Sequence, residues 1–74
     1  DRTLFESLRQ LRRKLADEMG VPAYIVFSDA SLRDMARQRP QTLDEFRKIR
    51  GVGDRKTEDF GEEFIELIAD STGN

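Results

Sequence analysis

The segment 57–74 contains a concentration of side chains that can bind a cation or transfer a proton. It carries six carboxylates and no lysine or arginine: Glu58, Asp59, Glu62, Glu63, Glu66 and Asp70. A carboxylate cluster can hold a hard cation such as Mg²⁺, and paired carboxylates can act as acid and base where a water-excluding site separates their pKa values. Nothing in the sequence indicates a cleft, and charge at helical spacing is typical of a solvated face. We therefore expect no metal site here.

The composition argues against catalysis more broadly. The 74 residues are enough for one small domain and contain neither cysteine nor histidine. The commonest general base, the commonest metal ligand and any thiolate chemistry are therefore missing. We expect no catalytic residue, no cofactor in this domain and no enzymatic activity. No apolar run has the length of a membrane span. We treat residues 1–74 as a single domain cut from a longer protein, with a frayed end at 71–74.

A short glycine-rich segment is the first candidate for nucleic-acid contact. The segment GVGDRK, residues 51–56, lies between two expected helices. In helix-hairpin-helix motifs, the backbone amides of such a turn face a DNA phosphate, and Arg55 and Lys56 would add positive charge. Glycines are also needed at tight turns for conformational reasons alone. Asp54 can cap the free amides itself, so both interpretations remain open.

The only tyrosine is the second candidate. Tyr24 follows a proline within VPAYIVFSDASL, residues 21–32. It can be a half-buried core residue with its hydroxyl at the surface. Alternatively, an exposed ring beside Arg33 or Arg37 would stack on a base while an arginine holds the backbone.

The charge distribution separates two surfaces. All 13 basic residues and nine of the 15 acidic ones precede residue 57, so that part carries +4 and the remainder carries −6. Arg9 and Arg13 share the outer face of the first helix with Glu6 and Asp17, and we expect that face to be largely self-paired. Any proposed function must therefore account for an acidic last helix and a mildly basic remainder of the chain.

Helical signals account for most of the chain. Leu4, Leu8, Leu11, Leu15 and Met19 mark one face of a first helix, which Thr3 and Glu6 begin as a capping box and Gly20 and Pro22 end. Asp29 is the expected N-cap of a second helix that stops at Arg39-Pro40. Thr42 and Glu45 form another capping box.

The last helix is expected to begin at about Asp54, with Phe60, Phe64, Leu67 and Ile68 on its inner face. Gly61 within it indicates close approach of a neighbouring helix. Residues 23–27 are too short for an ordinary helix and predict a single 3₁₀ or helical turn, with Ile25, Val26 and Phe27 plugging the core. The fold class is all-α, a compact bundle with short connections.

The ordered motifs resemble the HRDC domain, the helicase-and-RNase-D C-terminal module. They are the L-R-x-x-R-x-x-x-A helix that includes 11–16, the V-P-x-Y-x-V-F-x-D run, the Leu32 helix ending at Pro40, the G-V-G turn and F-G-x-x-F at 60–64. The resemblance runs from about Leu4 to Ile68 and is greatest to the copies in bacterial RecQ-type DNA helicases. RNase D-like exonucleases are the alternative host.

The resemblance implies a five-helix bundle with an accessory role in selecting DNA structures. ATP and Mg²⁺ would act only in the parent helicase core. DNA contacts in the family lie on a basic and aromatic surface, and the family tyrosine matches Tyr24. We therefore take Tyr24, Arg33, Arg37, Arg55 and Lys56 as candidate nucleic-acid-binding residues. We expect a bacterial intracellular, nucleoid-associated monomer that functions in DNA repair and recombination and makes no membrane contact.

Two functions remain open after the sequence analysis. Carboxylates at Glu6, Asp17, Asp34 and Asp54 interrupt the basic residues. We therefore expect weak DNA binding or none, with any contact preferring single strands at Tyr24. The six unpaired carboxylates of the last helix would repel DNA and instead favour a basic protein surface. That surface is either the parent helicase core or another domain of the same chain.

Overall fold

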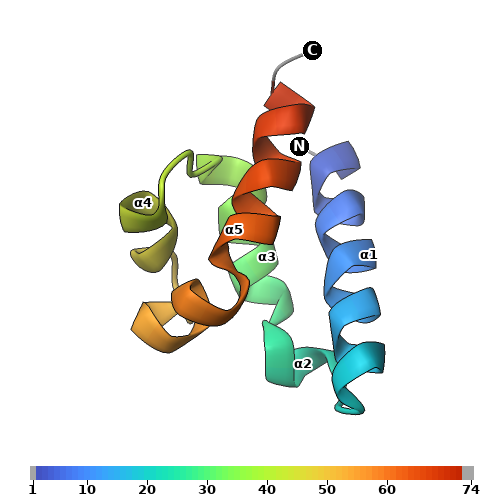
Figure 1. The fold of residues 1–74 in the computed structure, drawn as a ribbon. Helices are drawn as coiled ribbons and strands as arrows, with labels where there is room; N and C mark the ends of the chain where they lie inside the picture. Colours follow the sequence, from blue (N-terminus) through green and yellow to red (C-terminus); the bar gives the residue numbers. More distant parts are fainter. Residues whose placement is uncertain (1, 73–74) are drawn as a thin grey trace.

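The computed structural model describes residues 2–72 of the chain, and these residues form a bundle of five helices (Figure 1). In chain order they are α1 Arg2–Met19, α2 Ala23–Val26, α3 Asp29–Gln38, α4 Leu43–Arg47 and α5 Gly53–Thr72. No strand occurs among these residues. The expected all-α class and five-helix bundle are confirmed.

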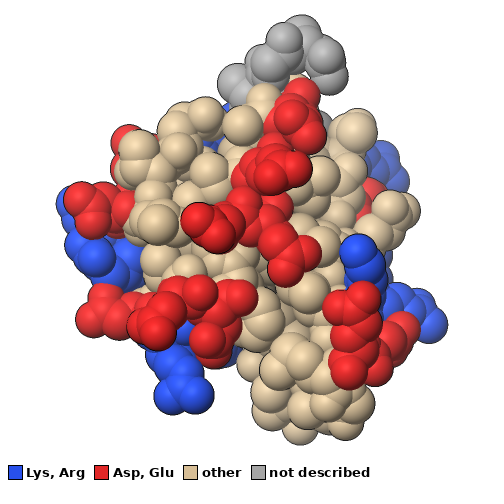
Figure 2. Space-filling view, viewed as in Figure 1, with Lys and Arg blue, Asp and Glu red and all other residues tan. Residues whose placement is uncertain are grey.

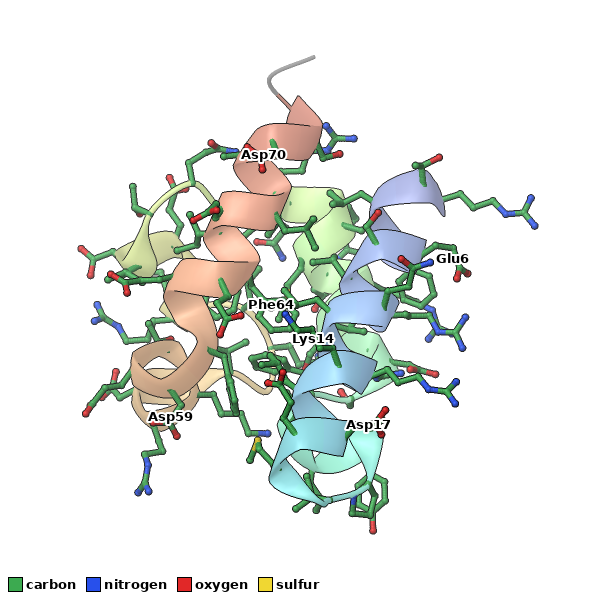
Figure 3. All side chains as sticks on the ribbon, turned by 45° about the vertical axis from the view of Figure 1, so that its right-hand side comes forward. Glu6, Lys14, Asp17, Asp59, Phe64 and Asp70 are labelled. Atoms are coloured by element: carbon green, nitrogen blue, oxygen red, sulfur yellow. The ribbon has the colours of Figure 1, made fainter. Side chains whose placement is uncertain are left out.

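The bundle is organised around α1, which contacts α2, α3 and α5, while α4 packs on α5. In Figure 1, α3 runs back along α1 in the opposite direction, and α2 lies by the C-terminal end of α1. Figure 3 shows Phe64 among the side chains that fill the space between α5 and its neighbours. The fully buried side chains come from every helix and from the connection after α2; the largest are Phe27, Phe46, Phe64, Leu4, Leu8, Leu32, Met35 and Ile68.

The end of α1 is set by local sequence, as predicted. Gly20 has a φ of 71°, the left-handed conformation that a glycine adopts without steric cost. Its N–H donates to the carbonyl of Asp17 at 3.2 Å, and the N–H of Val21 donates to that of Ala16 at 3.0 Å. These two bonds form a Schellman motif. The predicted start is wrong: Thr3 lies inside α1 rather than before it.

The apolar run at 23–27 forms a single helical turn, as predicted. The turn is α2, and Val26 with the following Phe27 is fully buried. The expected plug is smaller than predicted, because Ile25 is 46% exposed. Successive helical residues point about 100° apart, so one turn cannot direct three consecutive side chains into the core.

The N-cap of α3 is Ser28, not the predicted Asp29. The N–H of Ser31 donates to the Ser28 hydroxyl oxygen at 3.1 Å. Asp29 is the first helical residue, and its carboxylate lies 2.8 Å from a guanidinium nitrogen of Arg12. The helix ends before Pro40 as predicted, with Arg39 in the left-handed conformation.

The capping box before α4 is confirmed with one change. The N–H of Glu45 donates to the Thr42 hydroxyl oxygen at 3.1 Å. The Glu45 carboxylate accepts from the N–H of Gln41 at 2.7 Å, one residue before the position that a capping box uses. Both bonds fix the direction in which the chain enters α4.

Two glycines mark close approaches between elements. A Cβ at Gly51 would lie 2.5 Å from the Ser31 hydroxyl oxygen, and that hydroxyl is already held by its bond to the Arg50 carbonyl at 2.6 Å. A Cβ at Gly61 would lie 2.9 Å from a methyl group of Leu43 on α4. The predicted close approach at Gly61 is therefore confirmed.

The last helix begins within one residue of the predicted position. Phe64 and Ile68 are buried, and Phe60 and Leu67 pack on the core, so the predicted inner face of α5 is confirmed. The frayed end expected at 71–74 remains a prediction, since α5 includes residues 71 and 72, while 73–74 lie outside the described residues.

Candidate nucleic-acid interface

Tyr24 is the most exposed large hydrophobic side chain identified on the described surface. It lies on α2 with 69% of its surface exposed, and Met19 and Ile25 beside it in sequence are also exposed. Figure 2 shows uncharged atoms over the position of α2. Because α2 is one turn held by Pro22 and the buried Phe27, Tyr24 is presented to solvent on a fixed backbone. Such a ring is available for stacking.

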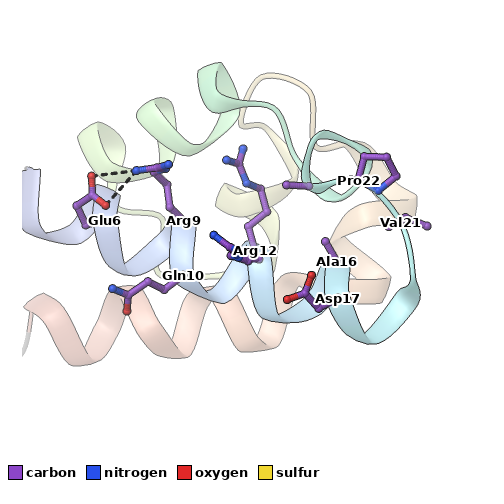
Figure 4. A pocket seen from close by; sticks show the side chains of 10 residues that line it. Glu6, Arg9, Gln10, Arg12, Ala16, Asp17, Val21 and Pro22 are labelled. Atoms are coloured by element: carbon purple, nitrogen blue, oxygen red, sulfur yellow. Dashed lines mark hydrogen bonds and ion pairs between the residues drawn. The ribbon is translucent and has the colours of Figure 1, made fainter.

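A hollow of about 460 Å³ lies between α1 and the start of α2 (Figure 4). We call it the α1–α2 hollow. It ends at Pro22 and Ala23, the residues directly before Tyr24, and is lined by Glu6, Arg9, Gln10, Arg12, Arg13, Ala16, Asp17, Val21, Pro22 and Ala23.

The charges of the α1–α2 hollow are only partly compensated. Arg9 pairs with Glu6 at 3.1 Å, as expected (Figure 4). Arg13 and Asp17 were expected to pair as well, but Arg13 forms no ion pair with any residue in the described part of the chain. Arg13 was therefore missed as a candidate. In the sequence, only its position on the outer face of the first helix, beside Arg9, could have indicated such a role.

Arg12 lines the same hollow but has a structural role. It is 8% exposed, and its Nη1 donates to the buried carbonyl of Phe27 at 2.9 Å and lies 2.8 Å from a carboxylate oxygen of Asp29. It thereby joins α1 to both sides of the connection between α2 and α3. Its Nε has no hydrogen-bond partner among the described residues.

Arg33 and Arg37 lie together, but outside the α1–α2 hollow. They line a second hollow of about 430 Å³ with Arg2, Phe5, Ala36 and Arg39. We call it the arginine hollow. The Arg33 guanidinium lies over the Phe5 ring at 5.8 Å from its centroid, within the range of a cation–π contact. Arg37 pairs with Asp34 one turn earlier on α3. Arg2 and Arg39 were not among the sequence candidates.

The structure does not bring Tyr24 and Arg33 into one hollow. Arg33 contacts Phe5 in the first turns of α1, whereas Tyr24 follows the C-terminal end of α1 (Figure 1). The two are nine residues apart in sequence, but α3 runs back along α1 and carries Arg33 away from α2.

Arg55 and Lys56 lie on the first turns of α5 and already have partners. The Arg55 guanidinium lies 3.3 Å from a carboxylate oxygen of Asp59, and the Lys56 ammonium lies 5.4 Å from the centroid of the Phe27 ring. The carboxylate of Asp54 lies 3.4 Å from Arg47. These contacts explain why basic residues occur at this turn without reference to a ligand.

The outer face of α5 is an acidic ridge, visible along the helix in Figure 2. It consists of exposed residues Glu58, Asp59, Glu62, Glu63, Glu66 and Asp70, and Figure 3 shows Asp59 and Asp70 toward its two ends. The expectation that all six are unpaired is wrong, because Asp59 pairs with Arg55. Within the described residues, no group of acidic side chains is arranged to hold a metal ion. No described helix has the length and apolar character to cross a membrane.

The chain is similar to several DNA helicases. It is 47% identical over 68 residues to the ATP-dependent DNA helicase RecQ of Pasteurella multocida and 43% identical over 65 residues to that of Bacillus subtilis. These matches cover 92% and 88% of the chain but 11% of each helicase. The matched region is therefore a small part of each of these long proteins.

A solved structure and a family model agree with these relatives. The third HRDC domain of the D. radiodurans RecQ matches with a TM-score of 0.91 and 37% sequence identity, over 96% of this chain and 93% of that one. The model of the HRDC domain matches residues 1–68. Fold, helix order and sequence thus lead to one conclusion: the chain belongs to the HRDC domain family.

Proposed function

We propose that this chain is a non-catalytic accessory domain of a RecQ-type DNA helicase. It tunes how the parent protein binds DNA, and it binds single-stranded DNA weakly through Tyr24. The similarity to RecQ helicases over most of the chain supports this host. On this proposal, ATP and Mg²⁺ belong to the parent helicase core, and the other partners are domains of the same chain.

The observation that carries the proposal is the exposed ring of Tyr24, which directly follows two residues, Pro22 and Ala23, of a hollow that contains arginines. The ring offers a face on which an unpaired base can stack. Arg13 has no ion-pair partner in the described part of the chain and lines the hollow with Arg9. A phosphate there would therefore meet a guanidinium that no carboxylate neutralises.

Binding at this site is expected to be weak. Glu6 forms an ion pair with Arg9, and Asp29 forms one with Arg12. Asp17 adds a further negative charge to the hollow. Counterion release increases with the number of phosphates that the protein neutralises, and each nearby carboxylate opposes that gain. A preference for single strands follows from stacking, since only an unpaired base exposes its face to Tyr24.

Tyr24→Ala is expected to weaken binding to single-stranded DNA about 5- to 150-fold, because stacking of one base is worth roughly 1–3 kcal/mol. The free energy of unfolding should change by less than about 0.5 kcal/mol, since the side chain is mostly exposed. Fluorescence anisotropy with a labelled oligothymidylate measures the affinity, and urea denaturation measures the stability.

Two neighbouring substitutions are the controls for Tyr24→Ala. Tyr24→Phe keeps the ring and should keep most of the affinity. Ile25→Ala removes an exposed apolar side chain from the same turn and should bind as the wild type does. Equal weakening by Ile25→Ala would show that the loss does not arise from stacking and would contradict the assignment.

A second candidate function rests on the acidic ridge. Glu62, Glu63 and Glu66 are exposed, and no ion pair with another described residue involves them. Clustered charge of one sign attracts a surface of the opposite sign and repels DNA. In this alternative, the domain does not bind DNA; it docks on a basic surface of the parent chain, where it competes with DNA.

Charge reversal distinguishes this alternative. Changing Glu62, Glu63 and Glu66 to lysine in the parent helicase should raise its DNA affinity and alter its DNA-stimulated ATPase activity if the ridge docks internally. Glu18→Lys, an exposed site outside the ridge, is the control and should change neither. If both parameters are unaffected by the triple reversal, the docking alternative is excluded.

A further inference from the structure

The charged residues that line the arginine hollow are all positive. Four of its lining residues are arginines, Arg2, Arg33, Arg37 and Arg39, and no carboxylate is among the lining residues. By contrast, the α1–α2 hollow includes Glu6 and Asp17, and the depressions along α5 are lined by residues of the acidic ridge. A cleft lined by one sign of charge concentrates ions of the opposite sign.

The hollow is also partly preorganised. Phe5 lines it, and the guanidinium of Arg33 lies over that ring, 5.8 Å from its centroid. A guanidinium that contacts an aromatic ring can still direct its N–H groups to an anion, with which it forms bidentate contacts. Neither Arg2 nor Arg33 forms an ion pair with another residue in the part of the chain that the structure describes. Asp34 pairs with Arg37, and Arg39 also has a partner, so the uncompensated charge of the hollow lies on Arg2 and Arg33.

Phe5 also connects the two hollows. The Arg9 guanidinium lies over the same ring, 6.0 Å from its centroid, and Arg9 lines the α1–α2 hollow, which extends to Pro22 and Ala23 at the start of α2. Arginines therefore follow one side of α1 from its first turns to α2. From Phe5 to Met19, a helical rise of 1.5 Å per residue separates the two ends by about 20 Å.

We infer that the arginine hollow binds the phosphodiester backbone of a single nucleic-acid strand, at a point of contact separate from Tyr24. The inference rests on the proposed function, because the same strand places an unpaired base on Tyr24. A strand repeats one phosphate per nucleotide and so can contact both ends of α1. An acidic peptide offers carboxylates for the arginines but no base for Tyr24, so the combination favours a nucleic acid.

The salt dependence of binding separates the two points of contact. For a single strand, each phosphate that the protein neutralises adds about 0.7 to the slope of log affinity against log salt. The Arg33→Gln/Arg37→Gln variant should therefore bind a labelled oligothymidylate more weakly and with a slope that is shallower by about 0.7 for each phosphate that it fails to neutralise. Tyr24→Ala should weaken binding without changing the slope, because a stacked ring releases no counterion.

Lys14→Gln is the matched control for the arginine variant. It removes a positive charge from an exposed position of α1, and Figure 3 shows Lys14 on the side of α1 toward α5 rather than at either hollow. Its slope should equal that of the wild type. Arg33 and Arg37 are exposed, so unchanged circular-dichroism melting curves should accompany the altered binding.

Three results would overturn the inference, and they differ in whether the proposed function is also contradicted. If Arg33→Gln/Arg37→Gln keeps the wild-type slope while Tyr24→Ala weakens binding, the hollow binds no phosphate and the proposed function remains. If the wild type binds no single strand at low salt, both fail. If polyglutamate, at an equal concentration of charge, displaces the strand from the wild type but not from the arginine variant, the hollow is assigned to an acidic protein instead.

Discussion

Replacing Phe27 with alanine is expected to lower the free energy of unfolding by about 3–5 kcal/mol. The side chain is fully buried, and its ring makes edge-to-face contacts with Phe46, Phe60 and Phe64 at centroid distances of 6.0, 5.7 and 5.0 Å. The loss combines the transfer of the ring to solvent with the cavity left among three aromatic rings. Urea denaturation followed by circular dichroism measures it.

The size of this effect matters because small domains are marginally stable. At roughly 0.05–0.15 kcal/mol per residue, a chain of this length has about 4–11 kcal/mol of stability, so the substitution removes a large fraction of it. Phe5→Ala is the control, because Phe5 is only partly buried at the edge of the core, and it should cost clearly less. If the two variants lose equal stability, Phe27 is not the centre of the core.

Arg12→Met is expected to lower the free energy of unfolding by about 2 kcal/mol, mainly because it leaves the buried carbonyl of Phe27 without its donor. For a domain of this size, that loss corresponds to a fall in Tm of roughly 10 °C. Methionine retains much of the packing of the arginine stem, so the change isolates the polar contacts. Thermal unfolding followed by circular dichroism measures the shift.

Asp29→Asn separates the two contacts of Arg12. Asp29 has 56% of its side-chain surface exposed, so water and salt screen its attraction to Arg12, and its loss should cost at most about 1 kcal/mol. A fall in Tm as large as that of Arg12→Met would place the energy in the ion pair rather than in the bond to the Phe27 carbonyl. The pair would then also weaken strongly with added salt.

The sequence was sufficient where short-range signals determine the structure. The spacing of leucines from Leu4 to Leu15 predicts the buried face of α1, and Gly20 predicts its end, because both depend on residues within a few turns. Thr42 predicts the start of α4 for the same reason. The single turn of α2 follows from its length and from the proline before it.

The sequence was insufficient where a contact with a residue far away in the chain determines the local structure. Ser28 and Asp29 are both good N-caps, and Arg12, far away in sequence, takes the carboxylate of Asp29 and leaves the cap to Ser28. Likewise, no local pattern shows that Arg2 and Arg39 join Arg33 and Arg37, since that grouping requires the start of α1 to lie beside the end of α3. The separation of Arg33 from Tyr24 has the same origin.

The most direct test of the proposed DNA contact is an anisotropy titration of this chain with labelled single-stranded and duplex DNA of one length, at low and then rising salt. We predict saturable binding that is tighter for the single strand and that weakens as salt increases. Equal or tighter binding to the duplex would contradict a contact made by stacking on Tyr24. No binding to either DNA at low salt would contradict DNA binding altogether and would favour the acidic ridge as the functional surface.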